Sequence, residues 1–237
     1  MESTSTASSS TLKHCQQRPV VLPLSRAEDE ALTFRRRGYL KHSTVYDSTQ
    51  GAVYKACKLD SDGEPVCYVT IKRASKNCTK IHNEACVLRQ LTISEDDNNQ
   101  TSVANYIAAY VDFFESSHDC YLVTQFVETG MTLREFVRQC HDYIKHHKLP
   151  FSEFVKSVKF LLWQLCVTVE WMHSVKKVSH SDLNAENVMI ENVKFRPLRN
   201  GQVSIDRQIS IKLCEFGAAS QLHANDSGYA DNWSLGE

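Results

Sequence analysis

The segment at residues 178–190 constrains this chain more than any other, because apolar residues enclose a polar centre there on both sides. The apolar ends predict two short buried strands, and the polar centre predicts a tight loop between them. Within the loop, His180, Asp182 and Asn187 stand in the order H-x-D-x-x-x-x-N. A fold that contains this segment must therefore present an acid and an amide to one small volume.

The residue types in this loop have two interpretations. The Asp182 carboxylate can accept a proton from a hydroxyl, and the Asn187 amide oxygen can bind a hard cation such as Mg²⁺. Asp and Asn are also favoured in turns that carry no chemistry. The loop alone leaves a catalytic site and a plain turn as equal alternatives.

Composition narrows the class of protein. The chain has 237 residues, 42% of them hydrophobic, and a formal net charge of -1, which suits one large domain or two small lobes. The near-neutral charge argues against nucleic acid and membrane surfaces as partners, and no apolar run reaches the length of a membrane span. The N-terminus has no apolar signal core, and nine scattered cysteines without a C-x-x-C pair favour reduced thiols. We therefore expect an intracellular protein, cytoplasmic or, as the alternative, nuclear.

The N-terminal third divides into a polar leader and a β-rich part. Residues 1–35 contain few apolar side chains, so they cannot bury enough surface to offset the entropy of ordering, and we expect a disordered leader. Short β-type runs follow at residues 51–57 and 66–71. The turn signal Asp62-Gly63 lies between these runs and predicts a β-hairpin.

A lysine and a glutamate follow the hairpin at a spacing that suggests a pair. Lys72 closes the second strand, where a lysine by itself is often a solubilising strand end. Glu84 lies beside a helical stripe that begins soon afterwards, and this gives the lysine a candidate partner. The stripe consists of Ile81, Ala85, Leu88 and Leu91.

Helical periodicity dominates the next part of the chain. Residues 133–144 predict one helix, and a second apolar stripe predicts a buried central helix. A basic and polar insertion at residues 191–208 is expected to be a surface excursion between two short strands. The second stripe consists of Val158, Leu161, Leu162, Leu165, Val169 and Met172.

Taken in order, these motifs resemble the signatures of eukaryotic protein kinases. The loop is similar to H-R-D-L-x-x-x-N, with Ser181 in place of the arginine. Residues 69–72 are similar to V-A-I-K, with Thr70 in place of the alanine. Residues 215–217 are similar to D-F-G, with Glu215 in place of the aspartate.

The resemblance implies an α+β fold with two lobes. A small β-rich N-lobe with one helix would occupy residues 36–127, and a mostly helical C-lobe would occupy residues 128–237. Residues 231–236 resemble the D-x-W-S-L-G start of a long helix in the family, yet no A-P-E motif separates them from Glu215. We therefore expect an incomplete C-lobe, from either a fragment or a shortened splice form; the alternative is that the match at residues 231–236 arises by chance.

The resemblance also implies roles for single residues. Asp182 would orient and deprotonate a substrate hydroxyl, while Lys72, pinned by Glu84, would hold the phosphates of ATP. Asn187 and Glu215 would bind Mg²⁺. The ATP-binding residues would be Gly51, Val53, Thr70, Lys72, Thr124, Gln125, Val127 and Met189.

Departures from the family pattern leave the function open. Of the glycine motif G-x-G-x-x-G only Gly51 is kept, with Tyr46 and Ser48 at the other two positions, and Asn184 stands where serine/threonine kinases carry a lysine. Three functions follow: an ATP- and Mg²⁺-dependent kinase acting on Ser/Thr hydroxyls of a protein substrate, a pseudokinase that binds nucleotide or serves as a scaffold, and a small-molecule phosphotransferase. The segments at Glu215 and beyond argue against the third, and the sequence predicts no oligomeric state.

Overall fold

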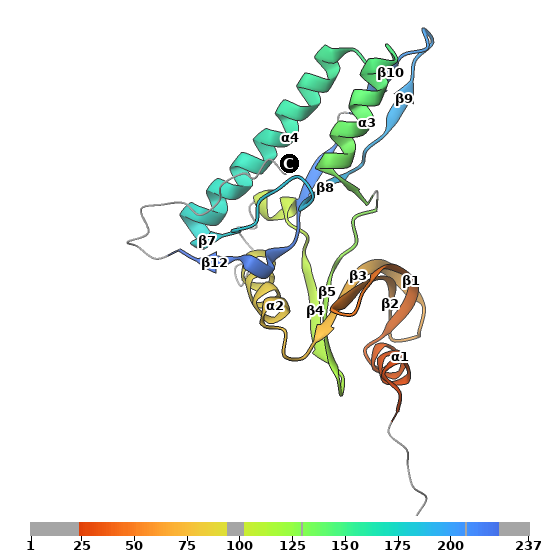
Figure 1. The fold of residues 1–237 in the computed structure, drawn as a ribbon, viewed down its shortest axis with the longest axis vertical. Helices are drawn as coiled ribbons and strands as arrows, with labels where there is room; N and C mark the ends of the chain where they lie inside the picture. Colours follow the sequence, from red (N-terminus) through yellow and green to blue (C-terminus); the bar gives the residue numbers. More distant parts are fainter. Residues whose placement is uncertain (1–23, 94–101, 129, 207, 223–237) are drawn as a thin grey trace, which may run out of the picture.

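The computed structural model describes residues 24–93, 102–128, 130–206 and 208–222, and within them the expected α+β architecture is present. The large sheet lies at one end of the molecule, and the two long helices lie at the other, beside several short strands (Figure 1). The motif at residues 231–236 lies outside the described residues. No helix among the described residues is long and apolar enough to cross a bilayer.

The N-lobe is built on a five-stranded antiparallel sheet with the order β1-β2-β3-β5-β4. The expected hairpin is β2 and β3, and Asp60 closes its turn by accepting from the backbone N–H groups of Asp62 and Glu64. Helix α2 connects β3 to the remaining strands. The bounds are β1 (Tyr39–Asp47), β2 (Gly51–Leu59), β3 (Pro65–Ser75), α2 (Thr79–Thr92), β4 (Tyr110–Glu115) and β5 (Asp119–Gln125).

The register of this sheet fixes which side chains share a face. Val53 pairs with Lys72 across β2 and β3, and Thr70 pairs with Thr124 across β3 and β5. Side chains of directly opposed residues point to the same side of a sheet. Four residues that the sequence assigns to nucleotide binding therefore meet on one face.

Helix α1 (Arg26–Arg36) corrects the prediction that residues 1–35 are a disordered leader. A capping box starts the helix: Ser25 Oγ accepts from the Glu28 N–H, and the Glu28 carboxylate accepts from the Ser25 N–H. Phe34 is buried and meets the rings of Tyr54 and Phe114 edge to face. Few apolar residues suffice here because one aromatic side chain enters an existing core. Residues 1–23 lie outside the described residues.

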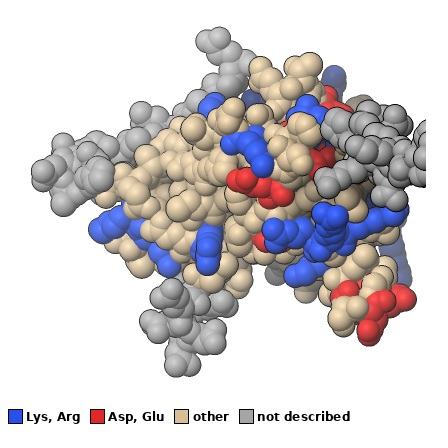
Figure 2. All heavy atoms as spheres, turned by 90° about the horizontal axis from the view of Figure 1, so that it is seen from below, with Lys and Arg blue, Asp and Glu red and all other residues tan. Residues whose placement is uncertain are grey.

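Charged residues of α1 also reach the sheet. The Glu30 carboxylate is buried and accepts hydrogen bonds from Tyr54 Oη at 3.0 Å and from Arg73 Nη1 at 3.2 Å. The Arg26 guanidinium donates to Asp119 at 2.7 Å, next to the β4–β5 turn. Figure 2 shows the N-lobe end of the molecule, where groups of Lys and Arg lie beside groups of Asp and Glu. Helix α1 is thus held by paired charges around one aromatic anchor.

The C-lobe combines two long helices with short paired strands. A three-stranded sheet has the order β11-β8-β6, β9 pairs with β10, and β12 pairs with β7. The insertion at residues 191–208 contains the β9–β10 hairpin, and its Phe195 packs on Tyr143 of α3. The bounds are β6 (Met131–Thr132), α3 (Leu133–Lys145), α4 (Phe151–Trp171), β7 (Val178–Ser179), β8 (Val188–Glu191), β9 (Phe195–Pro197), β10 (Val203–Ile205), β11 (Ser210–Leu213) and β12 (Ser220–Gln221).

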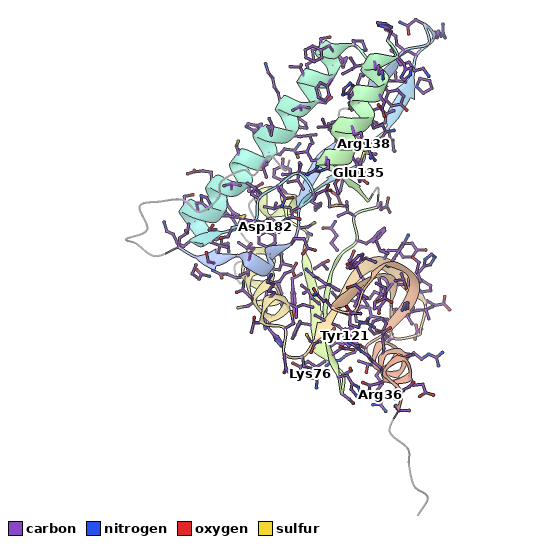
Figure 3. All side chains as sticks on the ribbon, viewed as in Figure 1. Arg36, Lys76, Tyr121, Glu135, Arg138 and Asp182 are labelled. Carbon is purple, nitrogen blue, oxygen red and sulfur yellow. The ribbon has the colours of Figure 1, made fainter. Side chains whose placement is uncertain are left out.

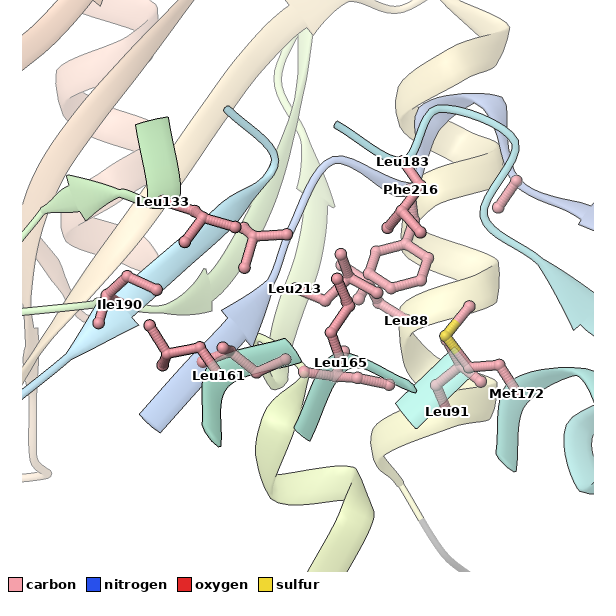
Figure 4. Close-up of a cluster of buried hydrophobic side chains, with 14 of the residues drawn as sticks. Leu88, Leu91, Leu133, Leu161, Leu165, Met172, Leu183, Ile190, Leu213 and Phe216 are labelled. Atoms are coloured by element: carbon pink, nitrogen blue, oxygen red, sulfur yellow. The ribbon is translucent and has the colours of Figure 1, made fainter. Parts of the chain in front are cut away.

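One hydrophobic core runs through both lobes. Leu161 and Leu165 of α4 pack in a cluster with Leu213 and Phe216, and Leu88 of α2 joins them from the N-lobe (Figure 4). Phe216, the central residue of the segment that resembles D-F-G, is fully buried. This core therefore ties the glutamate-bearing helix α2 to the C-lobe.

Helix α4 is buried on one face only, which corrects the prediction of a buried central helix. Leu161 and Leu165 of the predicted stripe are buried, whereas Leu162 is 41% exposed. Phe160 and Trp163 lie beside it, 42% and 55% exposed, with their rings stacked. The predicted stripe includes one residue too many, Leu162, because the described neighbours of α4 cover a single side of the helix.

Replacing Phe34 tests whether α1 is an integral part of the N-lobe. We expect Phe34→Ala to lower the free energy of unfolding by about 3 kcal/mol, because it removes a buried ring and leaves a cavity. Urea unfolding followed by circular dichroism measures the change. The control is Leu32→Ala on the same helix, at a side chain that is 37% exposed, with an expected change within about 0.5 kcal/mol. Equal losses in the two variants would contradict this account.

Candidate active site

A cavity of about 260 Å³ lies between the lobes and contains most of the residues assigned to ATP. Gly51 does not line it. A more open hollow of about 920 Å³ lies on the outer side of Gln125 and Phe126, and none of the predicted catalytic or metal-binding residues lines it. We therefore assign the chemistry to the smaller cavity. Of the predicted nucleotide-binding residues, its lining includes Val53, Thr70, Lys72, Thr124, Gln125, Val127 and Met189.

Sequence reasoning missed part of this lining. Leu122 stands two residues before Thr124 on β5, and both side chains line the cavity. The period of two along a strand was the signal that would have found Leu122. Ala108 and Glu186 come from loops, where no periodic pattern exists to place them.

Lys72 is the charged centre of the site. Its ammonium donates to Glu84 Oε2 at 2.8 Å and to Glu215 Oε2 at 2.6 Å. Lys72 is on β3, Glu84 is on α2 and Glu215 follows β11, so three separate parts of the chain meet at this nitrogen. Burial by itself lowers the pKa of Lys72, but the two carboxylates outweigh it and the pKa is raised. The ammonium therefore stays charged. Burial raises the pKa of Glu84, and Lys72 opposes that rise.

The segment around Glu215 is held in an unusual backbone conformation. Glu215 has φ +64°, the left-handed region that costs a residue with a Cβ. Phe216 follows it into the core and packs on the His180 ring, with 4.6 Å between ring centroids. Asn83 of α2 donates to the carbonyl of Ala219 at 2.8 Å. These contacts hold the residues that follow Glu215, and the Glu215 carboxylate itself is paired with Lys72.

The loop of Asp182 is organised by two amides. Asn187 Nδ2 donates to the Asp182 carbonyl at 2.8 Å and to Asp182 Oδ2 at 3.0 Å. Asn184 Nδ2 donates to Asp182 Oδ1 at 3.1 Å, and Asn184 Oδ1 accepts from the Asn187 N–H at 3.2 Å. The Asp182 carboxylate is thereby oriented from both sides. Figure 3 places Asp182 between the two lobes.

His180 connects this loop to the segment of Glu215. Its Nε2 donates to the Cys214 carbonyl at 2.8 Å, and its Nδ1 accepts from the Asp182 N–H at 3.3 Å. The Cys214 N–H in turn donates to the Asn187 carbonyl at 2.9 Å. The structure thus brings Lys72, Glu215 and the Asp182–Asn187 loop together, although Asp182 and Asn187 lie beside the cavity and do not line it.

The donor set fits a magnesium ion held together with phosphates. Asn187 uses its N–H group on Asp182, which leaves an amide oxygen as a ligand, and Glu215 supplies a carboxylate. Mg²⁺ is commonly bound by one or two such groups plus substrate phosphates. The described residues contain no cluster of three His, Cys, Asp or Glu side chains that would form an all-protein metal site.

Comparison with known proteins supports the same assignment. The chain is 22% identical over 181 residues to the human dual specificity protein kinase CLK1. This alignment covers 75% of this chain and 34% of that protein. It is 23% identical over 175 residues to the serine/threonine-protein kinase RCK2 of Saccharomyces cerevisiae, covering 66% of this chain and 26% of that protein. The chain thus spans about a third or less of these relatives.

Structural comparison shows the same fold. The crystal structure of a kinase domain matches with a TM-score of 0.56 and 19% sequence identity, covering 81% of this chain and 53% of that chain. The family model described as the protein kinase domain matches residues 41–234. This chain belongs to the protein kinase family.

Proposed function

We propose that this protein is a kinase that binds ATP with Mg²⁺ and transfers the terminal phosphate to a Ser or Thr hydroxyl of a protein substrate. The observation that carries the proposal is the Lys72–Glu84 pair in the interlobe cavity, next to the Asp182–Asn187 loop. Phosphoryl transfer needs alignment and charge neutralisation more than covalent help, and these groups supply both. We also propose a cytoplasmic location.

In this proposal the base of ATP enters the apolar end of the cavity. Val53 and Thr70 would cover one face of the base from the sheet, and Met189 would cover the other face from β8. Thr124 stands at the back of the cavity across from Thr70. The side chains on these four strands line a cavity of about 260 Å³ that would take the planar base.

The reacting groups would act at the other end. Lys72 would hold the phosphates, with Glu84 fixing its position, and Asp182 would accept the proton of the substrate hydroxyl as the oxygen attacks the terminal phosphorus. A new O–P bond forms, the bond to the leaving phosphate breaks, and ADP departs. A magnesium ion, held by Asn187 and Glu215, would neutralise phosphate charge.

Binding of nucleotide without transfer is the second candidate, and one observation favours it. The Glu215 carboxylate is engaged by Lys72 at 2.6 Å, and its side chain is one methylene longer than the aspartate of the family motif. Magnesium demands near-ideal octahedral geometry, so a displaced carboxylate weakens its binding. Such a protein would act as a scaffold whose shape responds to nucleotide.

Ligand binding can be tested by thermal unfolding. We expect saturating ATP with Mg²⁺ to stabilise the protein by about 3 kcal/mol, because the ligand binds the native state alone, and to raise Tm by about 5 °C or more. Differential scanning fluorimetry measures the shift. Val53→Trp fills the cavity and should remove it, whereas Val66→Trp, at a side chain that is 62% exposed on β3, should keep it. An unchanged Tm of the unaltered protein with ATP and Mg²⁺ would contradict the proposal.

Replacing Asp182 tests phosphate transfer. We expect Asp182→Asn to lower the rate by about 10³-fold, because the amide cannot accept the hydroxyl proton, while the thermal shift with ATP is retained. Radiolabelled phosphate incorporation into a generic Ser/Thr substrate measures the rate. Asp62→Asn, in the exposed β2–β3 turn, is the control with an unchanged rate. Equal rates in the Asp182 variant and the control would show that a contaminating kinase does the work.

Shortening Glu215 separates the two candidate functions. We expect Glu215→Asp to raise the transfer rate about tenfold, or about 1.4 kcal/mol of barrier, because the shorter carboxylate favours metal binding over contact with Lys72. Glu215→Gln is the matched control and should lower the rate, since it keeps the length and removes the charge. A fall in both variants would contradict the metal-geometry account.

A further inference from the structure

The turn between β1 and β2 is closed by the side chain of Ser48. Its Oγ accepts from the backbone N–H groups of Gln50 and Gly51, both at 3.3 Å. It also donates to the Gly51 carbonyl at 3.0 Å, which in addition accepts from the Ser48 N–H at 2.9 Å. The turn thus satisfies the N–H groups of Ser48, Gln50 and Gly51 from within itself.

This turn corresponds to the loop that, in the kinase motif, lies over the phosphates of ATP. Backbone N–H groups in such loops are the donors that bind phosphate oxygens. Because the Ser48 hydroxyl already accepts two of them here, they are not offered to a ligand. Val45 and Val53, on either side of the turn, line the cavity, so the turn lies at its edge with these two donors already occupied.

The packing of β2 against β3 explains why position 51 is a glycine. A Cβ placed there would lie 2.7 Å from the backbone oxygen of Arg73 on β3. This contact is too short, and the paired strands would have to shift to remove it. The glycine therefore serves the close approach of β2 to β3. Its retention in the sequence is no sign that the turn binds phosphate.

The turn is also fixed in place and carries a negative charge. Asp47, just before Ser48, accepts from Arg73 Nη2 at 3.3 Å, and the same guanidinium donates from Nη1 to the buried Glu30 of α1. The Asp47 side chain is 59% exposed. Asp47 pairs with Ala52, and Ala52 pairs with Arg73, so this anchor lies on the face of the sheet opposite to Val53 and Lys72. It fixes the turn from behind and leaves the cavity side of the turn to its backbone groups.

The charges that line the cavity also disfavour tight binding of a terminal phosphate. Lys72 is the cation among the described lining residues, and three carboxylates accompany it, those of Glu84, Glu186 and Glu215. Lys72 already pairs with two of these. Asn184, at the family's lysine position, is neutral, and its amide is engaged with Asp182. A terminal phosphate therefore finds no second cation in this lining.

We propose that Ser48 is a specificity-determining residue that prevents the site from gripping the terminal phosphate, so that ADP binds as tightly as ATP. This inference rests on the proposed nucleotide binding at the same cavity. The base, the ribose and the phosphates within reach of Lys72 are common to both nucleotides, and the terminal phosphate adds nothing to binding. The product ADP then competes with ATP on equal terms.

Isothermal titration calorimetry on the full chain, with Mg²⁺ in excess and with ATP and ADP titrated separately, tests the inference. The unaltered protein should give Kd values for the two nucleotides within about threefold of each other. Ser48→Ala removes the hydroxyl and frees both N–H donors, so ATP should gain about tenfold over ADP. Thr49→Ala, at the exposed neighbour in the same turn, is the matched control and should leave the ratio unchanged.

The outcomes are distinct. ATP binding more than tenfold tighter than ADP binding in the unaltered protein would overturn the role of Ser48 and leave the proposed function intact. An unchanged ratio in Ser48→Ala, or the same change in Thr49→Ala, would do so as well. Absence of heat with either nucleotide, together with no thermal shift, would overturn both this inference and the proposed function.

Discussion

The site depends on one ammonium group, that of Lys72, shared between two carboxylates from different parts of the chain. Glu84 brings α2 to the sheet, and Glu215 brings the end of β11 to the same point. Glu84 is buried, so its attraction to Lys72 is stronger than in water and leaving it unpaired is costly, whereas Glu215 is 50% exposed and water can solvate its carboxylate. The pairing therefore connects β3, α2 and the segment after β11 at the edge of the cavity, and a change at any of the three residues alters the contacts of the other two.

Much of the fold follows from sequence patterns that are local. The β2–β3 hairpin was predicted from its alternation and the Asp62-Gly63 turn, and α2 from a stripe whose four members are all buried. The placement of the site residues was predicted through the family resemblance, and the structure brings Lys72, Glu84 and Glu215 together. Their roles in binding and catalysis remain predictions.

The features that sequence reasoning missed depend on tertiary context. Helix α1 was lost because its composition is polar, and a single ring, that of Phe34, anchors it in a core assembled by distant strands. Leu162 was placed inside because a stripe gives the direction of a side chain but not the identity of what covers it. The closed turn at Ser48 could not be predicted, because a hydrogen bond between a hydroxyl and nearby backbone produces no periodic pattern in the sequence.

The fork of Arg73 has a consequence for the start of the chain. One arm of this guanidinium holds Glu30 on α1, and the other holds Asp47 at the start of the β1–β2 turn. Proteolytic trimming that removed α1 would strip the buried carboxylate from Arg73 and withdraw a ring from the aromatic cluster. The β1–β2 turn would then lose part of the contact that fixes it to β3, so loss of α1 would loosen the strands that carry Val53 and Lys72, although α1 packs on the opposite face of the sheet.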